Sequence, residues 1–510
     1  MLWRAPVLLL ALATAATITC CCHGAAEATA RRGRGENGAS PVVLNAWQLA
    51  AARRTTPPAR AGAVLLALRT GNSIILHGGI SESVAAFDSD RLEPLGDLWL
   101  YSLRDDNWRQ IRTDGSIGPR AFHAATQLHA ISGHAYMFGG QTSAGAIIPE
   151  GDQQQQPQPQ PLPVEFSDSV IRVQDVSVGN VRLDELKRPN NNDPWPEARV
   201  QATFDLVGAN TGTAACGVLF GGISQQGTIL GDAWLFHPDN LSWAKVPTPP
   251  ELKPRYAHVT AVVRRQLILS SGCTSFNDTS CIETGDVWTL AIHNNDCTDA
   301  TWTRIAQLPL GMPPRRFGGV NSLVVGDDVL VFEGAHGSTS GSATTRTFHR
   351  ISLEFDEATS QYTDVSWTID GVDLASSAPA DRDGFSIVGM GNSPPISAVM
   401  FGGLAPLSFV SDTWRFSSLG PFWTRSQSDA LLPLSVILPG YATIGSDGYL
   451  FGGQTVEGIR NRGLWHYDLR TDAWQLRASS SQSRVAGTCL CALTDNHLAM
   501  FAGADNMYVL

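Results

Sequence analysis

Arginine and aspartate recur along this chain at positions where their charged groups could meet. Seven arginines each stand just before a short apolar segment, and we call them the leading arginines: Arg60, Arg120, Arg199, Arg255, Arg316, Arg382 and Arg484. An aspartate opens a later, aromatic-rich segment in five of the stretches that follow: Asp97, Asp168, Asp232, Asp286 and Asp412. If these segments are strands of one sheet, each aspartate starts at the same edge two strands away, about 10 Å from the arginine backbone. A guanidinium reaches a carboxylate over that span, so the pattern predicts a repeated ion pair that stabilises each sheet.

Cysteine and asparagine mark two further kinds of chemistry. Apart from Cys20, Cys21 and Cys22, the chain has six cysteines: Cys216, Cys273, Cys281, Cys297, Cys489 and Cys491. An even number is compatible with disulfides, although their connectivity cannot be deduced from spacing. We predict one bond, between Cys273 and Cys281, because these two bracket a single short loop. The sequons Asn240-Leu241-Ser242 and Asn277-Asp278-Thr279 make Asn240 and Asn277 candidate glycosylation sites.

Motifs for catalysis are missing from the sequence. It has no His-Glu-x-x-His, no phosphate-binding glycine loop and no serine nucleophile elbow. His129 and His134 flank a predicted hairpin turn, which by itself is not a metal site. We therefore predict no catalytic residues, no metal site and no cofactor.

The elements that position these residues form a repeat. An apolar run ends in Gly-Gly at residues 78–79, 221–222, 402–403 and 452–453, and two tryptophans follow each time, at 99 and 108, 234 and 243, 414 and 423, and 465 and 474. Each repeat predicts four short strands: one after the leading arginine, one ending in Gly-Gly, one after the aspartate, and one carrying the second tryptophan. The period of about 50 residues and the alternating aromatics indicate an all-β chain of packed four-stranded antiparallel sheets.

The two ends of the repeat region complement each other. The last repeat has its first three strands, over 488–493, 498–503 and 507–510, and lacks a fourth. Near the N-terminus, Asn45-Ala46-Trp47-Gln48-Leu49 closely matches the fourth-strand segment Asp472-Ala473-Trp474-Gln475-Leu476. We predict that the N-terminal strand completes the last sheet and closes a ring. Counting the leading arginines and a degenerate segment at Pro439-Gly440-Tyr441 gives eight repeats.

With the Gly-Gly, aspartate and spaced tryptophan pattern, the sequence resembles the kelch-repeat family over almost everything after residue 44. The resemblance implies an eight-bladed kelch β-propeller of four-stranded antiparallel blades, and it is closer to the secreted, attractin-like kelch region than to cytoplasmic ubiquitin-ligase adaptors. In such adaptors, positions similar to the seven leading arginines contact acidic peptides. The resemblance therefore makes these arginines candidate partner-binding residues as well as candidate partners of the aspartates, and both interpretations stay open.

Two enzymes of the kelch class do not match this sequence. A copper radical oxidase needs two tyrosines and two histidines at its metal, whereas all eight tyrosines here occupy repeat positions. Iron-dependent specifier proteins carry Glu-x3-Asp-x3-His, which does not occur here.

The N-terminal residues predict a secretory leader. Arg4 precedes an apolar run from Val7 to Ile18, and Gly24-Ala25-Ala26 supplies the small residues that a signal peptidase needs. We expect residues 1–26 to be the signal peptide, 27–44 a disordered linker, and 45–510 the propeller, with a low-complexity loop over 149–163 in the second blade. The protein would be secreted or lumenal, and the alternative is a membrane anchor formed by an uncleaved N-terminal segment.

Composition and charge narrow the class of partner. Hydrophobic residues make up 43% and charged residues 16%, which fits a large buried core. The net charge of -11 disfavours nucleic acid as a ligand. We expect a monomeric interaction scaffold that binds a protein or glycan partner through the loop face of the propeller, without membrane insertion after signal removal. The alternative is a secreted oxidase or glycan-acting enzyme whose site forms only in three dimensions.

Overall fold

The structure is a computed structural model, and for some strand residues it describes the backbone alone. The described residues are 48–49, 57, 60–61, 63–67, 73–81, 94–102, 107–111, 117–126, 132–143, 165–177, 180–188, 190, 192–208, 215–256, 258–263, 266–270, 272–277, 280–284, 286–307, 320–325, 328–334, 348–356, 361–370, 379, 386–390, 397–402, 404–405, 408–417, 423–426, 433, 440–444, 447–452, 461, 463–479, 489–494, 497–502 and 506–509.

The chain divides into two compact units. The first takes its described residues from 60–317 and 355–364, and the second takes them from 48–49, 57, 318–354 and 365–510. Strands are the only regular elements in the described part of the chain. The structure is therefore all-β there, as the repeats predict.

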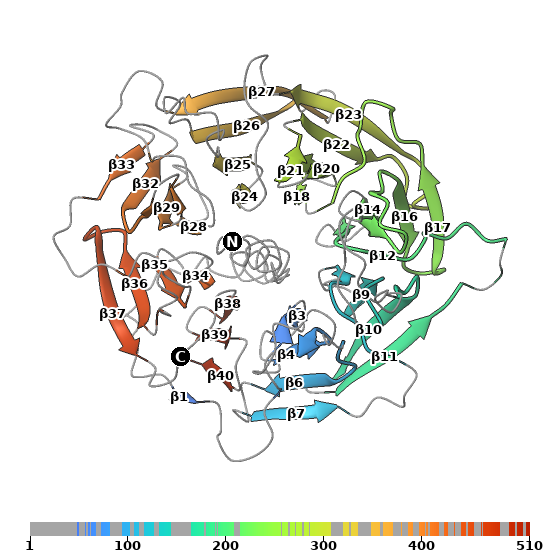
Figure 1. Ribbon diagram of the computed structural model, residues 1–510, viewed down its shortest axis with the longest axis horizontal. Coiled ribbons are helices and arrows are strands. Elements are labelled where there is room, and N and C mark those ends of the chain that lie inside the picture. Colours follow the sequence, from blue (N-terminus) through green and yellow to red (C-terminus); the bar gives the residue numbers. More distant parts are fainter. Residues whose placement is uncertain are drawn as a thin grey trace, which may run out of the picture. The chain divides into compact units, whose positions relative to one another are not determined.

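The first unit contains four sheets of four strands each, in which consecutive strands pair antiparallel (Figure 1). They are β3 (Val64–Ala67), β4 (Ser73–His77), β6 (Leu98–Ser102) and β7 (Asn107–Ile111); β8 (Ala124–Ala125), β9 (His134–Phe138), β10 (Val170–Ser177) and β11 (Asn180–Leu186); β13 (Thr203–Val207), β14 (Cys216–Phe220), β16 (Ala233–His237) and β17 (Ser242–Val246); and β18 (Val259–Val263), β19 (Gln266–Ser270), β22 (Asp286–Ile292) and β23 (Ala300–Gln307).

Four more sheets have all or most of their residues in the second unit. They are β24 (Val320–Val325), β25 (Asp328–Gly334), β26 (Phe348–Asp356) and β27 (Gln361–Asp370); β28 (Ser386–Met390), β29 (Ser397–Phe401), β32 (Thr413–Ser417) and β33 (Trp423–Arg425); β34 (Gly440–Ile444), β35 (Asp447–Phe451), β36 (Gly463–Asp468) and β37 (Ala473–Ser479); and β38 (Cys489–Thr494), β39 (His497–Ala502), β40 (Asn506–Val509) and β1 (Gln48–Leu49).

Two-stranded pairs join the leading segment of a repeat to the residues after its second strand. Short pairs of this kind are β2 (Arg60–Ala61) with β5 (Ile80–Ser81) and β12 (Arg199–Val200) with β15 (Ile223–Ser224). The other small pairs are hairpins, β20 (Cys273–Asn277) with β21 (Ser280–Glu283) and β30 (Leu404–Ala405) with β31 (Ser408–Phe409).

The second repeat forms a complete sheet although it lacks the fourth-strand tryptophan. Register places Val173 of β10 opposite Leu183 of β11, whereas Phe236 of β16 is opposite Trp243 of β17. Leu183 packs against the hydrophobic cluster shared with the preceding sheet, which is the side that a fourth-strand tryptophan would fill. Trp195, which follows β11, packs instead on the side of the next sheet, with its ring 6.1 Å from that of Trp243.

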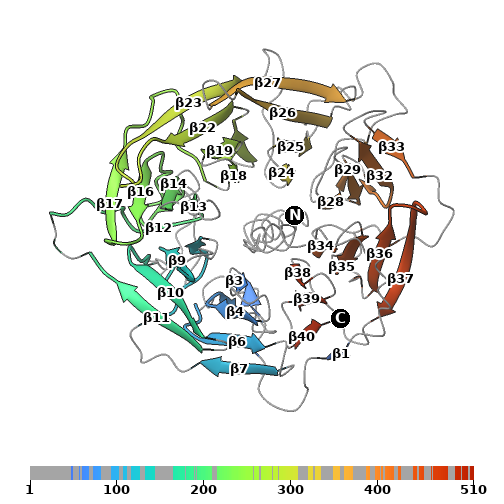
Figure 2. The same cartoon turned by 180° about the vertical axis from the view of Figure 1, so that it is seen from behind.

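Aromatic stacking joins successive sheets within each unit. A fourth-strand tryptophan packs on the phenylalanine that ends the second strand of the preceding sheet, with ring centroids 5.3–5.4 Å apart, in the pairs Trp243–Phe138, Trp302–Phe220 and Trp474–Phe401. First strands of neighbouring sheets also contact each other, β8 with β13 and β13 with β18 in the first unit, and β24 with β28, β28 with β34 and β34 with β38 in the second (Figure 2). Successive sheets with described side chains therefore bury their large side chains against each other within a unit.

The N-terminal strand joins the last sheet, as the sequence predicts. In β1, Gln48 pairs with Val509 and Leu49 with Tyr508 of β40, so β1 supplies the fourth strand (Figures 1 and 2). Residues 45–47 of the predicted strand lie outside the described residues.

The predicted start of the seventh repeat is wrong. In the sheets with a described leading arginine, that residue precedes by four the first-strand residue opposite the last residue of the second strand, as Arg199 precedes Thr203, which is opposite Phe220. Gly440 is opposite Phe451, so Gly440 and Tyr441 belong to the first strand and not to the segment before it, while Pro439 lies outside the described residues. Position 436, where the arginine would be, holds valine.

Candidate functional site

Three leading arginines each tie two successive sheets together through their backbone. Gly222, at the end of one sheet's second strand, donates its N–H to the carbonyl of Arg255 at 2.9 Å, and Gly140 and Gly79 do the same to Arg199 and Arg120 at 3.0 and 2.9 Å. A Cβ on Gly221 would lie 2.4 Å from the Arg255 carbonyl oxygen, and Gly222 has a φ of 100°. The Gly-Gly pair is therefore required for this close approach.

The side chains of Arg199 and Arg255 each pair with a carboxylate of their own sheet. Arg255 donates to both oxygens of Asp286 at 2.8 and 2.9 Å, and Arg199 donates to both oxygens of Asp232 at 2.6 and 2.9 Å. Arg199 also donates to the carbonyl of Gly221 at 3.1 Å. These are the two-pronged pairs that a guanidinium forms with a carboxylate.

The same carboxylates accept a hydrogen bond from an indole. Nε1 of Trp234 donates to Asp232 at 2.7 Å, and Nε1 of Trp288 donates to Asp286 at 2.6 Å. Burial acts to raise the pKa of each carboxyl, but the hydrogen bonds and charge of its arginine outweigh burial, so both pKa values lie below their usual range. The carboxylates are thus held in their charged form.

Arg120 has a different partner from the aspartate expected at Asp168. It donates to Oγ of Ser169 at 3.3 Å and to Oε1 of Glu185 at 3.1 Å, and Ser169 itself donates to Glu185 at 2.8 Å. Val170 is opposite Phe138 as Ala233 is opposite Phe220, so Ser169, and not Asp168, is equivalent to Asp232. The carboxylate is provided instead by Glu185 of β11, and Asp168 is exposed.

These contacts decide where three of the seven candidate partner-binding arginines lie. Arg120, Arg199 and Arg255 are 1%, 1% and 0% exposed. For these three the geometry supports the alternative interpretation, a pair that stabilises the sheet. The side chains of Arg60, Arg316, Arg382 and Arg484 lie outside the described side chains, and their partner-binding role stays a prediction.

Two buried histidines follow the leading arginines at the same position. His258 packs edge-on against Phe220 and its Nε2 lies 2.8 Å from Oγ1 of Thr203. His123 packs instead against His77, with Nε2 3.4 Å from Nδ1 of His77. Burial lowers the pKa of His258 to about 3, with Arg255 adding to the effect. Burial, with His77 and Arg120, holds the pKa of His123 well below its usual value. Both are structural, as the sequence predicts.

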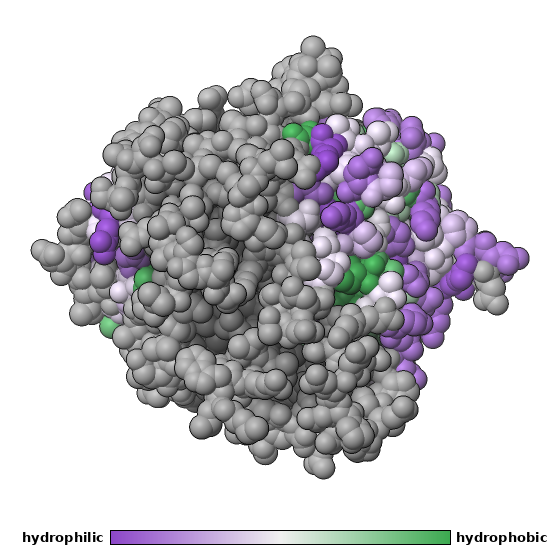
Figure 3. Space-filling view, turned by 45° about the horizontal axis from the view of Figure 1, so that its top comes forward, coloured by the Kyte–Doolittle hydropathy of each residue, from purple (hydrophilic) through white to green (hydrophobic). Residues whose placement is uncertain are grey.

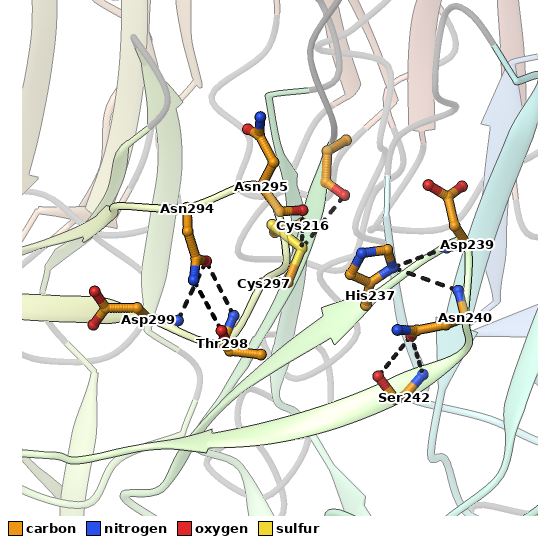
Figure 4. The surroundings of a disulfide bond; sticks show 11 residues. Cys216, His237, Asp239, Asn240, Ser242, Asn294, Asn295, Cys297, Thr298 and Asp299 are labelled. Atoms are coloured by element: carbon orange, nitrogen blue, oxygen red, sulfur yellow. Dashed lines mark hydrogen bonds between the residues drawn. A yellow bond between two sulfur atoms is a disulfide. The ribbon is translucent and has the colours of Figure 1, made fainter.

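A disulfide that the sequence left open links two successive sheets. Cys216 at the start of β14 is bonded to Cys297 in the turn between β22 and β23, and both are 1% exposed (Figure 4). The turn is held by Asn294, which donates to Oγ1 of Thr298 at 2.9 Å. The bond crosses 81 residues of sequence, and no spacing rule would have found it.

The predicted Cys273–Cys281 bond stays a prediction. Cys273 is in a disulfide, but its partner lies outside the described side chains. In the β20–β21 hairpin Cys273 is opposite Glu283 and Cys281 is opposite Phe276, with a register shift between them.

One of the two sequons lies on an exposed turn. Oδ1 of Asn240 accepts hydrogen bonds from Oγ and N of Ser242 at 2.6 and 3.1 Å, and Asn240 is exposed between β16 and β17 (Figure 4). The side chain of Asn277 lies outside the described side chains. The geometry leaves the amide of Asn240 accessible.

No group of three or more His, Cys, Asp and Glu residues is arranged to hold a metal ion within the described part of the chain. Among the described residues there is no helix long and apolar enough to cross a membrane. The described surface visible in Figure 3 is mostly hydrophilic, with hydrophobic residues in small groups.

Part of the chain is similar to a known protein. No protein-family model matches the chain. A stretch of 127 residues, 23% of the chain, is 29% identical to an F-box/kelch-repeat protein of Arabidopsis thaliana. The match covers 25% of that protein, so the chain corresponds to a quarter of its length. The similarity and the all-β sheets together fit a kelch-like repeat.

Proposed function

We propose that this chain is a secreted or lumenal kelch β-propeller that binds a protein partner through the connections at one edge of its sheets. Eight four-stranded sheets, with tryptophan packed on phenylalanine between successive ones, support a propeller of eight blades. The pairing of β1 with β40 supports closure of the ring by the N-terminal strand.

One observation supports the binding function. The repeated arginines and carboxylates stabilise the sheets, whereas the connections between strands differ in length and sequence from one repeat to the next. The described leading arginines are buried in pairs with carboxylates. Connections leave where the second strands end, among them 139–169 between β9 and β10, the longest between consecutive strands, and 335–347 between β25 and β26. The first of these holds the sequence QQQQPQPQPLP, which favours an extended polyproline conformation. Variable connections on a fixed scaffold are the usual place for partner recognition.

Arg316 is the leading arginine that best suits partner contact. The third strand of its sheet, β26, begins at Phe348 and follows Arg346-Thr347, so no aspartate opens it. An acidic or glycan-bearing protein would suit an arginine whose sheet has no aspartate at the start of its third strand.

Capture by loop-trimmed protein tests the binding function. The full chain, a variant with residues 144–164 and 335–346 replaced by short Gly-Ser linkers together with Arg316→Ala, and a Lys245→Ala control would be compared as baits in medium from the source cells. A partner retained by the wild type and by the control should be lost from the trimmed variant. A partner that stays bound after trimming would place the site elsewhere.

Secretion is supported by the buried Cys216–Cys297 bond, because disulfides persist in oxidising compartments. Intact-mass and peptide analysis of the protein from a eukaryotic host should show a start near Glu27 and a glycan on Asn240 or Asn277. A cytosolic protein that retains Met1 would contradict this part of the proposal.

A further inference from the structure

The sheet β34–β37 lacks a carboxylate that four other sheets contain. In those four, Nε1 of the third-strand tryptophan donates to the aspartate two residues earlier at 2.5–2.7 Å, in the pairs Trp99–Asp97, Trp234–Asp232, Trp288–Asp286 and Trp414–Asp412. The equivalent tryptophan of β36 is Trp465, which is opposite Leu476 as Trp234 is opposite Lys245. Two residues before Trp465 stands Gly463. Gly463 therefore provides no carboxylate acceptor, whereas the indole donor of Trp465 is still present.

Two buried hydrogen-bond donors lie next to the position that an aspartate side chain occupies in the other four sheets. Nε1 of Trp465 and Nδ2 of Asn461 have no hydrogen-bond partner among the described residues, and the two side chains are 6% and 2% exposed. A Cβ on Gly463 would lie 2.6 Å from Nε1 of Trp465, and the N–H of Gly463 donates to Oδ1 of Asn461 at 3.0 Å. A buried donor without an acceptor costs about 1–3 kcal/mol, so an acceptor placed here would be favourable.

The apolar side chain of Leu476 covers this position. The residues opposite the other third-strand tryptophans are Gln110, Lys245, Arg304 and Arg425. Leu476 is 45% exposed, and its Cδ1 lies 2.6 Å from the Cβ that Gly463 lacks. An exposed leucine turns about its side-chain bonds at small cost, so it can uncover the two donors. In doing so it offers an apolar contact next to them.

We propose that Trp465 and Asn461 form a binding site for a carboxylate supplied by another molecule, with Leu476 as its movable cover. The site takes in trans the group that Asp97, Asp232, Asp286 and Asp412 provide within their own sheets. It lies where β36 begins, at the same edge of the sheet as the connection from β35 (Figure 1). The inference rests on the proposed binding function and names the group that is recognised.

Indole NMR of the full chain tests the site directly. In a protein labelled with 15N-tryptophan, the Nε1–H resonance of Trp465 would be assigned with Trp465→Phe and followed during titration with sodium acetate, with sodium chloride as the control for ionic strength. We expect a saturable shift for Trp465. The Trp234 resonance, whose donor is already bonded to Asp232, should stay in place in the same spectra.

Two variants separate the site from a general salt effect. Asn461→Ala should weaken acetate binding about tenfold, the loss expected for one hydrogen bond of about 1.4 kcal/mol. Gly463→Asp should move the Trp465 resonance without ligand and abolish the response to acetate, because it supplies the carboxylate in the same chain. A Trp465 resonance that moves no more than that of Trp234, or equally in chloride, would overturn the proposal.

A second probe identifies the source of the carboxylate. Acetyl-Leu-Asp-amide should bind at least tenfold more tightly than acetate if the carboxylate belongs to a peptide, and Leu476→Ala should remove that advantage. Equal affinities would indicate a small carboxylate as the ligand. If Trp465 does not respond while loop trimming still releases a partner, the binding function stands and the carboxylate site is wrong.

Discussion

The pair between Arg255 and Asp286 should be among the largest single contributions to the stability of the first unit. Arg255 is 0% exposed and Asp286 is 4% exposed, and two hydrogen bonds of 2.8 and 2.9 Å join them. In Arg255→Ala the carboxylate keeps Trp288 and Thr284 as donors but loses its cation. A buried charge left without its partner costs about 3–5 kcal/mol.

Thermal and denaturant unfolding at neutral pH would measure this cost. For a unit of this size we expect Arg255→Ala to lower Tm by about 5–8 °C. Because Asp286→Ala strands the arginine in the same way, the double variant Arg255→Leu/Asp286→Leu should cost less than the sum of the two single changes.

The pH dependence supplies the control. The pKa of Asp286 is lowered in the folded protein, so its contribution is present above the unfolded pKa and is lost as pH falls through the folded value. Without Arg255 that advantage is gone, and the difference between wild type and Arg255→Ala should shrink in acid. A cost below about 1 kcal/mol at neutral pH, or one that does not change with pH, would refute the reasoning.

Three further predictions follow from the same geometry. Cys216→Ser, or full reduction, should lower stability by about 4–5 kcal/mol because the bond closes a long loop, and non-reducing peptide mapping should find Cys216 joined to Cys297; free thiols at both would contradict the structure. Since His123 and His258 are buried with lowered pKa values, the unfolded chain binds more protons than the folded protein below pH ~6.5, and stability should fall as the pH is lowered from roughly 6 to 4.5. Chemical unfolding across that range measures the slope, and His258→Gln should reduce it by about half; an unchanged slope would mean that other groups take up the protons. Deleting residues 27–50 removes β1 and exposes the edge of β40, so light scattering should show aggregation, and a monomeric variant with unchanged Tm would count against closure by β1.

Sequence reasoning predicted the strands well because each repeat carries its own markers. Gly-Gly ends the second strand, an aspartate precedes the third, and a tryptophan marks the fourth, so even the partnership of β1 with β40 was readable. It placed the carboxylate of the second repeat at Asp168, one residue before the residue that register puts at that point, Ser169. A shift of one residue turns a side chain to the opposite face of a strand, and repeat spacing cannot resolve it where a loop of variable length precedes the strand.

Two features of the sites had no signal in the sequence. The Cys216–Cys297 bond joins residues from different repeats, and only the packing of β14 beside the β22–β23 turn brings them together. The unpaired donors at Trp465 and Asn461 became visible only when register aligned Gly463 with the aspartates of other sheets. In both cases the sequence does not show which residues lie next to each other in the fold.

The pairing of β1 with β40 determines when β1 can fold during synthesis of the chain. The strand that is made first receives its partner last, after about 460 more residues have been synthesised. At ~5–20 residues per second, β1 waits about 20–90 s with its backbone groups unpaired. Throughout that interval the unpaired backbone groups of β1 can form hydrogen bonds with any other exposed strand, including that of a neighbouring chain. Premature pairing of β1 would therefore compete with its pairing to β40.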